Sequence, residues 1–307
     1  MSIPRDHHYL PQFYLERWAR DGKVFRYVRP CGPDGPIDCK SKSPKAIAYE
    51  RDLYCQPDID DPAASQSLEL TFFQRIDDRA AIALRKLDRL ERGSASDRLA
   101  LSQFMISLLH RSPSRMKAIK EELAKRTEDA PYRDLGGDDF ERVLKSTANR
   151  LLAMLVGSSK GASILSKFKA FRIDISGASK ALLTSDRPIT VSAQLFGPEA
   201  FMILPYAPDR LLLLAHREAI AKSFSSQKPN VLVAGINQAV VEQSEDIVIA
   251  ADKDATRMIN RLFLRPKPDR VFDAVGMIRR TPPTVDIAPQ TRSFSRRDKT
   301  GMKYLGV

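Results

Sequence analysis

The apolar residues of this 307-residue chain change their spacing near its middle, and that change limits the folds open to it. Between residues 65 and 156 they recur every three or four positions, which is the spacing of amphipathic helices. Between residues 170 and 216 they alternate with polar residues or form short runs between turns, as strands do. Consecutive strands with short connections favour an antiparallel sheet. We therefore predict an α+β fold, in which a helical block packs with a small, mainly antiparallel sheet.

The boundaries of the expected elements follow from turn and cap residues. Gly93 is a natural helix stop, and Pro113 should end the helix that precedes it. Helices are predicted over residues 65–92, 97–111, 115–126, 139–156, 231–251 and 255–264. Strands are predicted over residues 23–29, 170–175, 181–184, 189–193, 201–204 and 211–216. No linker interrupts the part after Gly93, so we expect one compact domain over residues 1–265.

The remaining segment, residues 266–307, differs from the rest in composition. It holds five prolines, nine basic and four acidic residues, and so five units of the net charge of +12. With few large apolar residues it cannot offset the entropy of ordering, so we predict a disordered basic tail. The pI of about 9.7 favours an acidic partner such as nucleic acid or a nucleotide. The alternative is a solubilising tail on a near-neutral domain.

Several classes of protein are excluded by what the sequence lacks. No apolar run approaches the length of a membrane span, and the first residues contain no apolar signal core. We therefore expect a cytoplasmic protein without a membrane partner. The three cysteines form neither a disulfide framework nor a zinc pair. Phosphate-loop, dinucleotide, nucleophile-elbow and zinc-helix motifs are missing, so no cofactor is evident, and a divalent metal is the one such group left open. The sequence does not indicate an oligomeric state.

The residues from Asp6 to Trp18, Asp-His-His-Tyr-Leu-Pro-Gln-Phe-Tyr-Leu-Glu-Arg-Trp, form the most specific run. This opening resembles that of a bacterial family known as domain of unknown function 4238. Four later stretches are also similar to it: Gln103 to Pro113, Thr184 to Pro188, Leu204 to Pro208, and the helix around Asn237. The resemblance spans about residues 6–264 and implies a bacterial, soluble protein. It marks positions to examine and does not indicate an activity.

The histidine pair leads the candidate site. Adjacent side chains of an extended segment face opposite ways, so His7 and His8 should not chelate one ion together. One of them is expected to face inward and the other toward solvent or a cleft. A neutral imidazole can act as a base, a metal ligand or a hydrogen-bonding core residue. The structural alternative is a buried histidine that anchors the N-terminus through Tyr9 and Gln12.

A polar stripe is predicted on the helix over residues 97–111. Gln103, Ser107, His110 and Arg111 share one side of it, next to an apolar side, and could border a pocket. An arginine there can hold a phosphate or carboxylate through two hydrogen bonds. The alternative is a solvated helix face whose C-terminal arginine is favoured by the helix dipole.

Two acidic positions complete the candidate set. Glu69 lies at the edge of an apolar stripe and could pair with Arg111 or a histidine; the alternative is an ordinary first-turn glutamate. Ser185 and Asp186 follow a short apolar run and precede Pro188, where they could bind a ligand or simply cap a turn. An aspartate that meets a histidine raises the basicity of its ring, and this would give Asp186 a catalytic role.

Two functions follow from these residues. In the first, a polar pocket at the His-His-Tyr segment binds a phosphate-containing ligand, a nucleotide or nucleic acid, and hydrolyses it. His7 or His8 would be the base, Asp186 or Glu69 would orient it, and Tyr9, Gln12, Gln103, His110, Arg111 and Ser185 would bind the ligand. In the second, the same groups form a structural network in a non-catalytic interaction protein. A third option is a nucleic-acid binder that recognises only the charge of the phosphate backbone.

Overall fold

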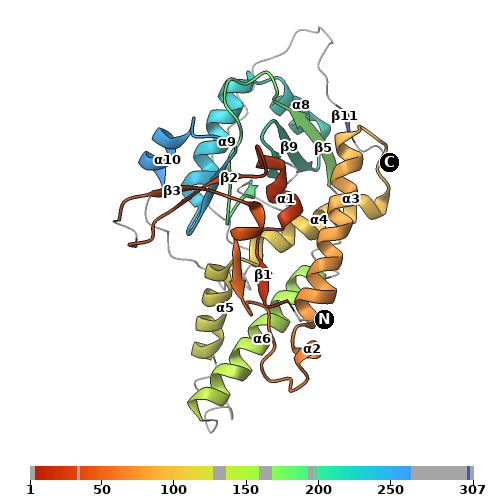
Figure 1. Ribbon diagram of the computed structural model, residues 1–307. Coiled ribbons are helices and arrows are strands. Elements are labelled where there is room, and N and C mark those ends of the chain that lie inside the picture. Colours follow the sequence, from red (N-terminus) through yellow and green to blue (C-terminus); the bar gives the residue numbers. More distant parts are fainter. Residues whose placement is uncertain are drawn as a thin grey trace.

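Short strands and single helical turns make up the first part of the chain in the computed structural model (Figure 1). The structure describes residues 4–32, 35–126, 136–158, 168–192, 197, 199–263 and 303–304. The first elements are β1 (Asp6–His8), α1 (Gln12–Leu15), the 3₁₀ turn η1 (Glu16–Trp18), β2 (Val24–Val28), β3 (Asp38–Lys42), η2 (Pro44–Ala46), β4 (Tyr49–Arg51) and α2 (Pro62–Ser65).

The helical block follows. It consists of the π-helical η3 (Leu68–Phe73), α3 (Gln74–Asp88), α4 (Ala95–His110), α5 (Pro113–Arg126) and α6 (Gly137–Gly157). The predicted helix over residues 65–92 thus begins with a π turn and ends at Asp88. Ser94 caps the start of α4 with a capping box. Its hydroxyl accepts a hydrogen bond from the Asp97 amide, and the Asp97 carboxylate accepts one from the Ser94 amide. In Figure 1, α5 and α6 extend side by side away from the rest of the molecule.

All strand pairs are antiparallel, which confirms the predicted α+β class. The strands form a two-stranded sheet β1-β4, a four-stranded sheet β3-β2-β10-β6 and a five-stranded sheet β11-β5-β9-β8-β7. The later strands are β5 (Lys169–Asp174), β6 (Thr184–Ser185), β7 (Thr190–Val191), β8 (Phe201–Ala207), β9 (Arg210–Ala215), β10 (Val248–Ala250) and β11 (Lys303–Tyr304). The helices α8 (Glu218–Ser225), α9 (Pro229–Gln243) and α10 (Thr256–Leu262) lie among them.

The prediction of one helix over residues 231–251 was wrong. Helix α9 ends at Gln243, and after a short loop the chain continues as β10, a central strand between β2 and β6. The residues Ile247 to Ile249 are β-branched and fully buried, so both sides of the segment face apolar neighbours. The spacing of such an apolar run is compatible with either a helix or a buried strand. Pairing with two neighbouring strands makes this segment a strand.

The five-stranded sheet separates two apolar cores. Along β8, Met202 and Leu204 pack toward the helical block, while Ile203 packs toward α8 and α9. Leu212 and Leu213 of β9 divide between the two cores in the same way. Because both faces are covered, these strands are apolar throughout rather than alternating.

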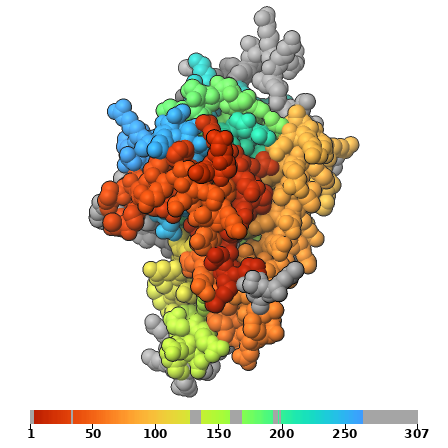
Figure 2. All heavy atoms as spheres, viewed as in Figure 1, coloured from red at the N-terminus to blue at the C-terminus, as the bar shows by residue number. Residues whose placement is uncertain are grey.

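The N-terminal segment joins the two halves of the fold. The Tyr14 hydroxyl donates to the carbonyl of Pro205 at 2.7 Å, and the Trp18 indole N–H donates to the carbonyl of Leu182 at 2.8 Å. Both side chains are fully buried. Figure 2 shows this segment, in red, lying between the orange helices and the blue C-terminal part of the described chain.

The predicted tail over residues 266–307 lies outside the described residues, except for Lys303 and Tyr304. These two form β11 and pair with β5. Among the described helices, none has the length and apolar character required to cross a membrane.

Candidate functional site

His7 is fully buried and holds the N-terminal strand in place. Its Nδ1 accepts a hydrogen bond of 2.9 Å from the Tyr54 amide, and its ring stacks on that of Tyr54. A nitrogen that accepts from an amide carries no proton, so the neutral ring is protonated at Nε2. Burial lowers the pKa of His7, against the opposing effects of Asp52 and Gln66. His7 is therefore a neutral ring whose one free lone pair is already used.

His8 is on the other face of β1 and is partly exposed. Its Nε2 lies 3.3 Å from the carbonyl oxygen of Lys45, and its ring is 5.5 Å from that of Tyr49. Burial lowers the pKa of the His8 ring. The opposite orientation of the two histidines is the one expected from strand geometry.

Arg111 is buried completely within the helical block. Its Nε donates to the carbonyl of Tyr9 at 2.7 Å, and its Nη1 donates to the carboxylate of Asp77 at 3.0 Å. The Tyr54 hydroxyl donates to the Arg111 carbonyl at 2.6 Å. The guanidinium thus anchors the backbone just after the histidine pair, and its Nη2 has no hydrogen-bond partner among the described residues.

Glu69 and Asp77 face this guanidinium. Burial raises the pKa of Glu69 to about 7, while Arg111 opposes the rise and Asp77 adds to it. Burial likewise raises the pKa of Asp77 to about 6, against Arg111. Glu69 also accepts a hydrogen bond from the His8 amide. It therefore contacts the backbone of the histidine pair.

The other predicted residues of this region are dispersed. Gln12 begins α1 and Gln103 lies in α4; both are partly buried, and within the described chain neither side chain has a hydrogen bond assigned to it. Ser107 is fully buried in α4. Burial and the charge of Arg115 lower the pKa of His110 to about 4. The stripe expected on this helix is thus largely covered by protein.

Asp186 lies elsewhere, at the end of β6, and is buried. Its carboxylate accepts hydrogen bonds from the backbone amides of Glu245 and Asp246, at 3.2 and 3.0 Å. Ser185 sits beside it, with its hydroxyl 3.4 Å from the Val240 carbonyl. The structure thus brings Asp186 to the loop between α9 and β10. The carboxylates that act on His7 and His8 are instead Asp52 and Asp6.

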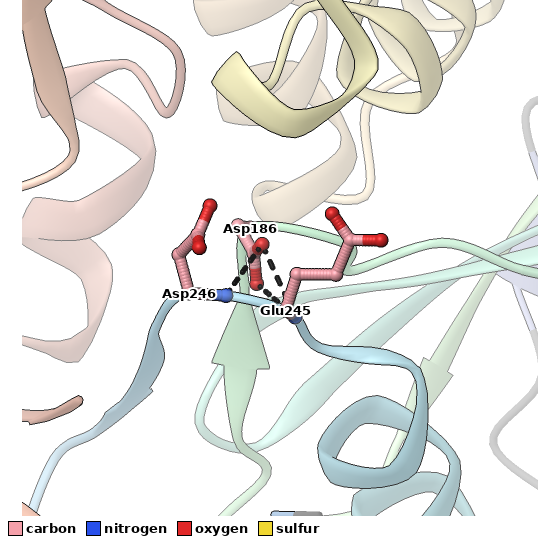
Figure 3. Close-up of side chains that lie close together, drawn as sticks. All are labelled: Asp186, Glu245 and Asp246. Carbon is pink, nitrogen blue, oxygen red and sulfur yellow. Dashed lines mark hydrogen bonds between the residues drawn. The ribbon is translucent and has the colours of Figure 1, made fainter. Parts of the chain in front are cut away.

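Three acidic side chains meet at this loop. Asp186, Glu245 and Asp246 each place a carboxylate oxygen within 4.8 Å of the others, and we call them the carboxylate cluster. Figure 3 shows the Asp186 carboxylate between the other two, which point to the same side of the chain. Arg187 forms an ion pair with Glu245. Burial and the charge of Asp246 raise the pKa of Asp186 to about 7.

Tyr9 connects the two regions. Its carbonyl accepts from Arg111, and the charges of Asp186 and Asp246 act on this residue, which is only 8% exposed. Besides burial, the charges of Asp186 and Asp246 are the largest causes that raise the pKa of the Tyr9 hydroxyl, and Arg26 opposes them. No hydrogen bond to this hydroxyl is assigned among the described residues.

Glu245 and Asp246 are not among the site residues predicted from the sequence. The predicted helix over residues 231–251 placed them inside a helix, where an acidic pair reads as a solvated face. A signal existed in the four residues Gln243 to Asp246, because a polar run of this kind between two apolar segments can mark a loop. Recognising that loop would have put two carboxylates next to a strand end.

Comparison with known proteins adds one match. A family model described as protein of unknown function, DUF4238, matches residues 6–254 and so includes Tyr9 and the whole carboxylate cluster. This agrees with the resemblance found in the opening residues. No curated protein and no solved structure matches the chain.

Proposed function

The chain belongs to the DUF4238 family of proteins of unknown function, and since that description names no activity, we propose a function from the geometry. We propose that the chain binds a phosphate-containing ligand, a nucleotide or a nucleic-acid strand, at the carboxylate cluster and Tyr9. We propose further that it hydrolyses a phosphoester bond there. The observation that carries this proposal is the meeting of three carboxylates at the end of β6, where the charges of Asp186 and Asp246 act on the largely buried residue Tyr9.

Two basic side chains offset part of the negative charge at the cluster and Tyr9. Arg187 contacts Glu245, and the charge of Arg26 acts on Tyr9. A phosphate near the cluster would therefore have basic groups to one side, in addition to the positive field of the whole chain.

The chemistry would be attack by water on phosphorus. Asp246, the most exposed of the three carboxylates, would take one proton from the water as its oxygen forms a bond to phosphorus. The bond from phosphorus to the leaving oxygen would break, and the Tyr9 hydroxyl would give that oxygen a proton. Tyr9 would recover its proton from solvent. Its raised pKa keeps it protonated and able to donate at neutral pH.

This proposal moves the chemistry away from His7 and Arg111. A phosphate cannot be held by Arg111 in this conformation, because the guanidinium is fully buried and bonded to Tyr9 and Asp77. The reaction type and the class of ligand stay as the sequence suggested. Asp186 keeps a place in the site as a positioned carboxylate, without a histidine partner.

A second function is favoured by the same buried network. Hydrogen bonds link His7 to Tyr54, Tyr54 to Arg111, and Arg111 to Asp77 inside the protein, which is the arrangement expected of structural groups in a non-catalytic interaction protein. Under this alternative the carboxylate cluster would only fix the loop before β10, through the bonds from its amides to Asp186.

Ligand binding and hydrolysis separate the two functions. The purified protein would be titrated with a nonhydrolysable ATP analogue and with a short oligodeoxythymidylate, each in calcium-containing buffer, and assayed for cleavage of bis(p-nitrophenyl) phosphate. Asp246→Asn and Tyr9→Phe should weaken binding or abolish cleavage, while Asp254→Asn, an exposed aspartate after β10, should not. Equal behaviour of all variants, or no binding and no cleavage by the parent, would favour the interaction protein.

A further inference from the structure

We infer that the exposed side of helix α3 binds double-stranded nucleic acid through the phosphate backbone. This side, which we call the arginine face, is defined by four exposed arginines of α3 and its C-cap: Arg75, Arg79, Arg85 and Arg89. In Figure 1, α3 runs along one side of the molecule. The inference does not rest on the proposed function, because none of these residues belongs to the carboxylate cluster.

The helical period brings these arginines to one side of α3. At about 100° per residue, all four fall within an arc of about 120° around the helix. The rise of about 1.5 Å per residue makes the face about 21 Å long from Arg75 to Arg89. The other side of the helix is buried and apolar, with Ile76, Ala80, Ala83, Leu84 and Leu87. Packing of that side against the core therefore leaves the arginines exposed.

The fold sorts the charges of residues 74–92. Six basic and four acidic side chains give this segment a net charge of only +2. Arg111 pairs with Asp77 at 3.0 Å, and two arginines of other elements pair with Asp88. Lys86 pairs with Asp97 of α4 at 3.0 Å. These three groups of the segment are held by partners elsewhere in the fold, so they neither add to the exposed charge nor neutralise it.

The charges that stay exposed are mainly positive. Arg92 adds a fifth arginine to the four of the arginine face, and the exposed carboxylates are those of Asp78 and Glu91, which leaves a surplus of three positive charges. Glu91 lies 3.5 Å from Arg89, and both side chains of this pair are well exposed. Within the described residues, no ion pair or hydrogen bond is assigned to the other side chains of the face, Arg75, Arg79 and Arg85.

Exposed guanidinium groups in a row suit a phosphate backbone. Arg75 and Arg79 are four residues apart, as are Arg85 and Arg89, so the members of each pair lie about 6 Å apart along the helix. A guanidinium binds a phosphate through two hydrogen bonds. One strand of B-form DNA carries a phosphate about every 3.4 Å along its axis. A face about 21 Å long therefore passes about six phosphates, enough to give each arginine a partner.

The remaining side chains of the face favour a duplex over other acidic partners. Among the exposed residues of α3, Ile82 is the one apolar residue, and none is aromatic. A single strand is bound by stacking its bases on aromatic rings, and a membrane surface by a broad apolar face. A protein partner is held by an apolar and aromatic centre. Contacts to the phosphates of a duplex require none of these and do not depend on base sequence.

Fluorescence anisotropy with a labelled DNA duplex of about 20 base pairs tests the inference on the full chain. With four phosphate contacts, the affinity of the parent should fall about 150-fold between about 50 and about 200 mM NaCl. The double variant Arg75→Gln, Arg79→Gln removes two of these contacts. It should bind at least about tenfold more weakly at the lower salt concentration, and its affinity should fall only about 12-fold over the same range.

The chain offers a matched control on another helix. Arg257 and Arg261 of α10 are exposed and also four residues apart, so Arg257→Gln, Arg261→Gln loses the same charge at the same spacing. This variant should bind the duplex like the parent. Arg75→Lys, Arg79→Lys keeps the charge of the arginine face and should retain the salt dependence of the parent.

Four results would overturn the inference. They are no saturable binding of the duplex by the parent, equal affinity and salt dependence of the parent and Arg75→Gln, Arg79→Gln, and an equal loss of affinity in the α10 control variant. The fourth is displacement of the duplex by poly-L-glutamate as readily as by unlabelled duplex, because the arginine face would then fit an acidic polypeptide.

The outcome is separable from that of the proposed function. Duplex binding that depends on Arg75 and Arg79 would support the inference even if the protein cleaves no phosphoester and Asp246→Asn behaves like the parent. Cleavage that depends on Asp246, by a protein that does not bind the duplex, would overturn the inference and support the proposed function.

Discussion

Replacing Glu69 with glutamine should make the protein more stable at alkaline pH. Glu69 is half-buried and lies close to Asp77. The charge of Arg111 offsets only part of the free-energy cost of ionising its carboxyl group there. The folded protein therefore holds the Glu69 proton more tightly than the unfolded chain does. Stability from such a group is fully present below the unfolded pKa and is lost as the pH rises through the folded pKa.

The size of the effect follows from the two pKa values. Glu69 titrates ordinarily at 4.5 and in the folded protein at about 7. Linkage then gives a loss of about 2–3 kcal/mol in the free energy of unfolding between about pH 5 and about pH 8. The groups that face Glu69 are Arg111, Asp77 and the backbone amide of His8, and all of them remain in the variant.

Urea unfolding of the parent and of Glu69→Gln, monitored by circular dichroism across this pH range, measures the difference directly. The variant should lose about 2–3 kcal/mol less than the parent over the range. Glu121→Gln, a change on the exposed side of α5, is the control and should leave the pH dependence as it is. If the free energies of unfolding of the parent and of Glu69→Gln changed in parallel with pH, the carboxyl of Glu69 would not have a raised pKa in the folded protein.

Three further predictions concern other buried polar groups. Tyr14→Phe should lower the free energy of unfolding by about 1–3 kcal/mol, because the Pro205 carbonyl loses its buried donor; urea unfolding measures this. Asn237→Leu should cost about 2 kcal/mol or more in the same assay, since its amide holds the backbone of both Leu183 and Ala181. His110→Gln should reduce the acid sensitivity of the fold. The pKa of His110 falls from 6.5 to about 4 on folding, so the parent loses stability as the pH drops through this range, by up to about 3 kcal/mol more than the variant.

Many of the helices and strands could be predicted from the spacing of apolar residues alone. The helices α4, α5 and α6 and the strands β5, β8 and β9 lie within a few residues of their predicted ranges, because each buries one continuous apolar face or run. The failure at β10 has a physical cause. Its three residues form a strand because they pair with β2 and β6, which are distant in the sequence. The local spacing of apolar residues contains no information about such partners.

The same limit applies to the site. Strand alternation correctly places His7 and His8 on opposite faces, because that rule is local. The meeting of Asp186 with Glu245 and Asp246 depends on the pairing of β6 with β10, across sixty residues of chain. The burial of Arg111 could not be predicted either, since its main partner is the backbone of Tyr9, and any residue type could have supplied that carbonyl.

Diffraction can test whether the carboxylate cluster and Tyr9 form the functional site. Crystals of the full chain soaked in MnCl₂, with data collected near the manganese absorption edge, would show bound ions as anomalous difference peaks. We expect a peak within bonding distance of Asp186, Glu245 and Asp246. Well-ordered carboxylates at the end of β6 without such a peak, in crystals that bind manganese at other positions, would contradict it.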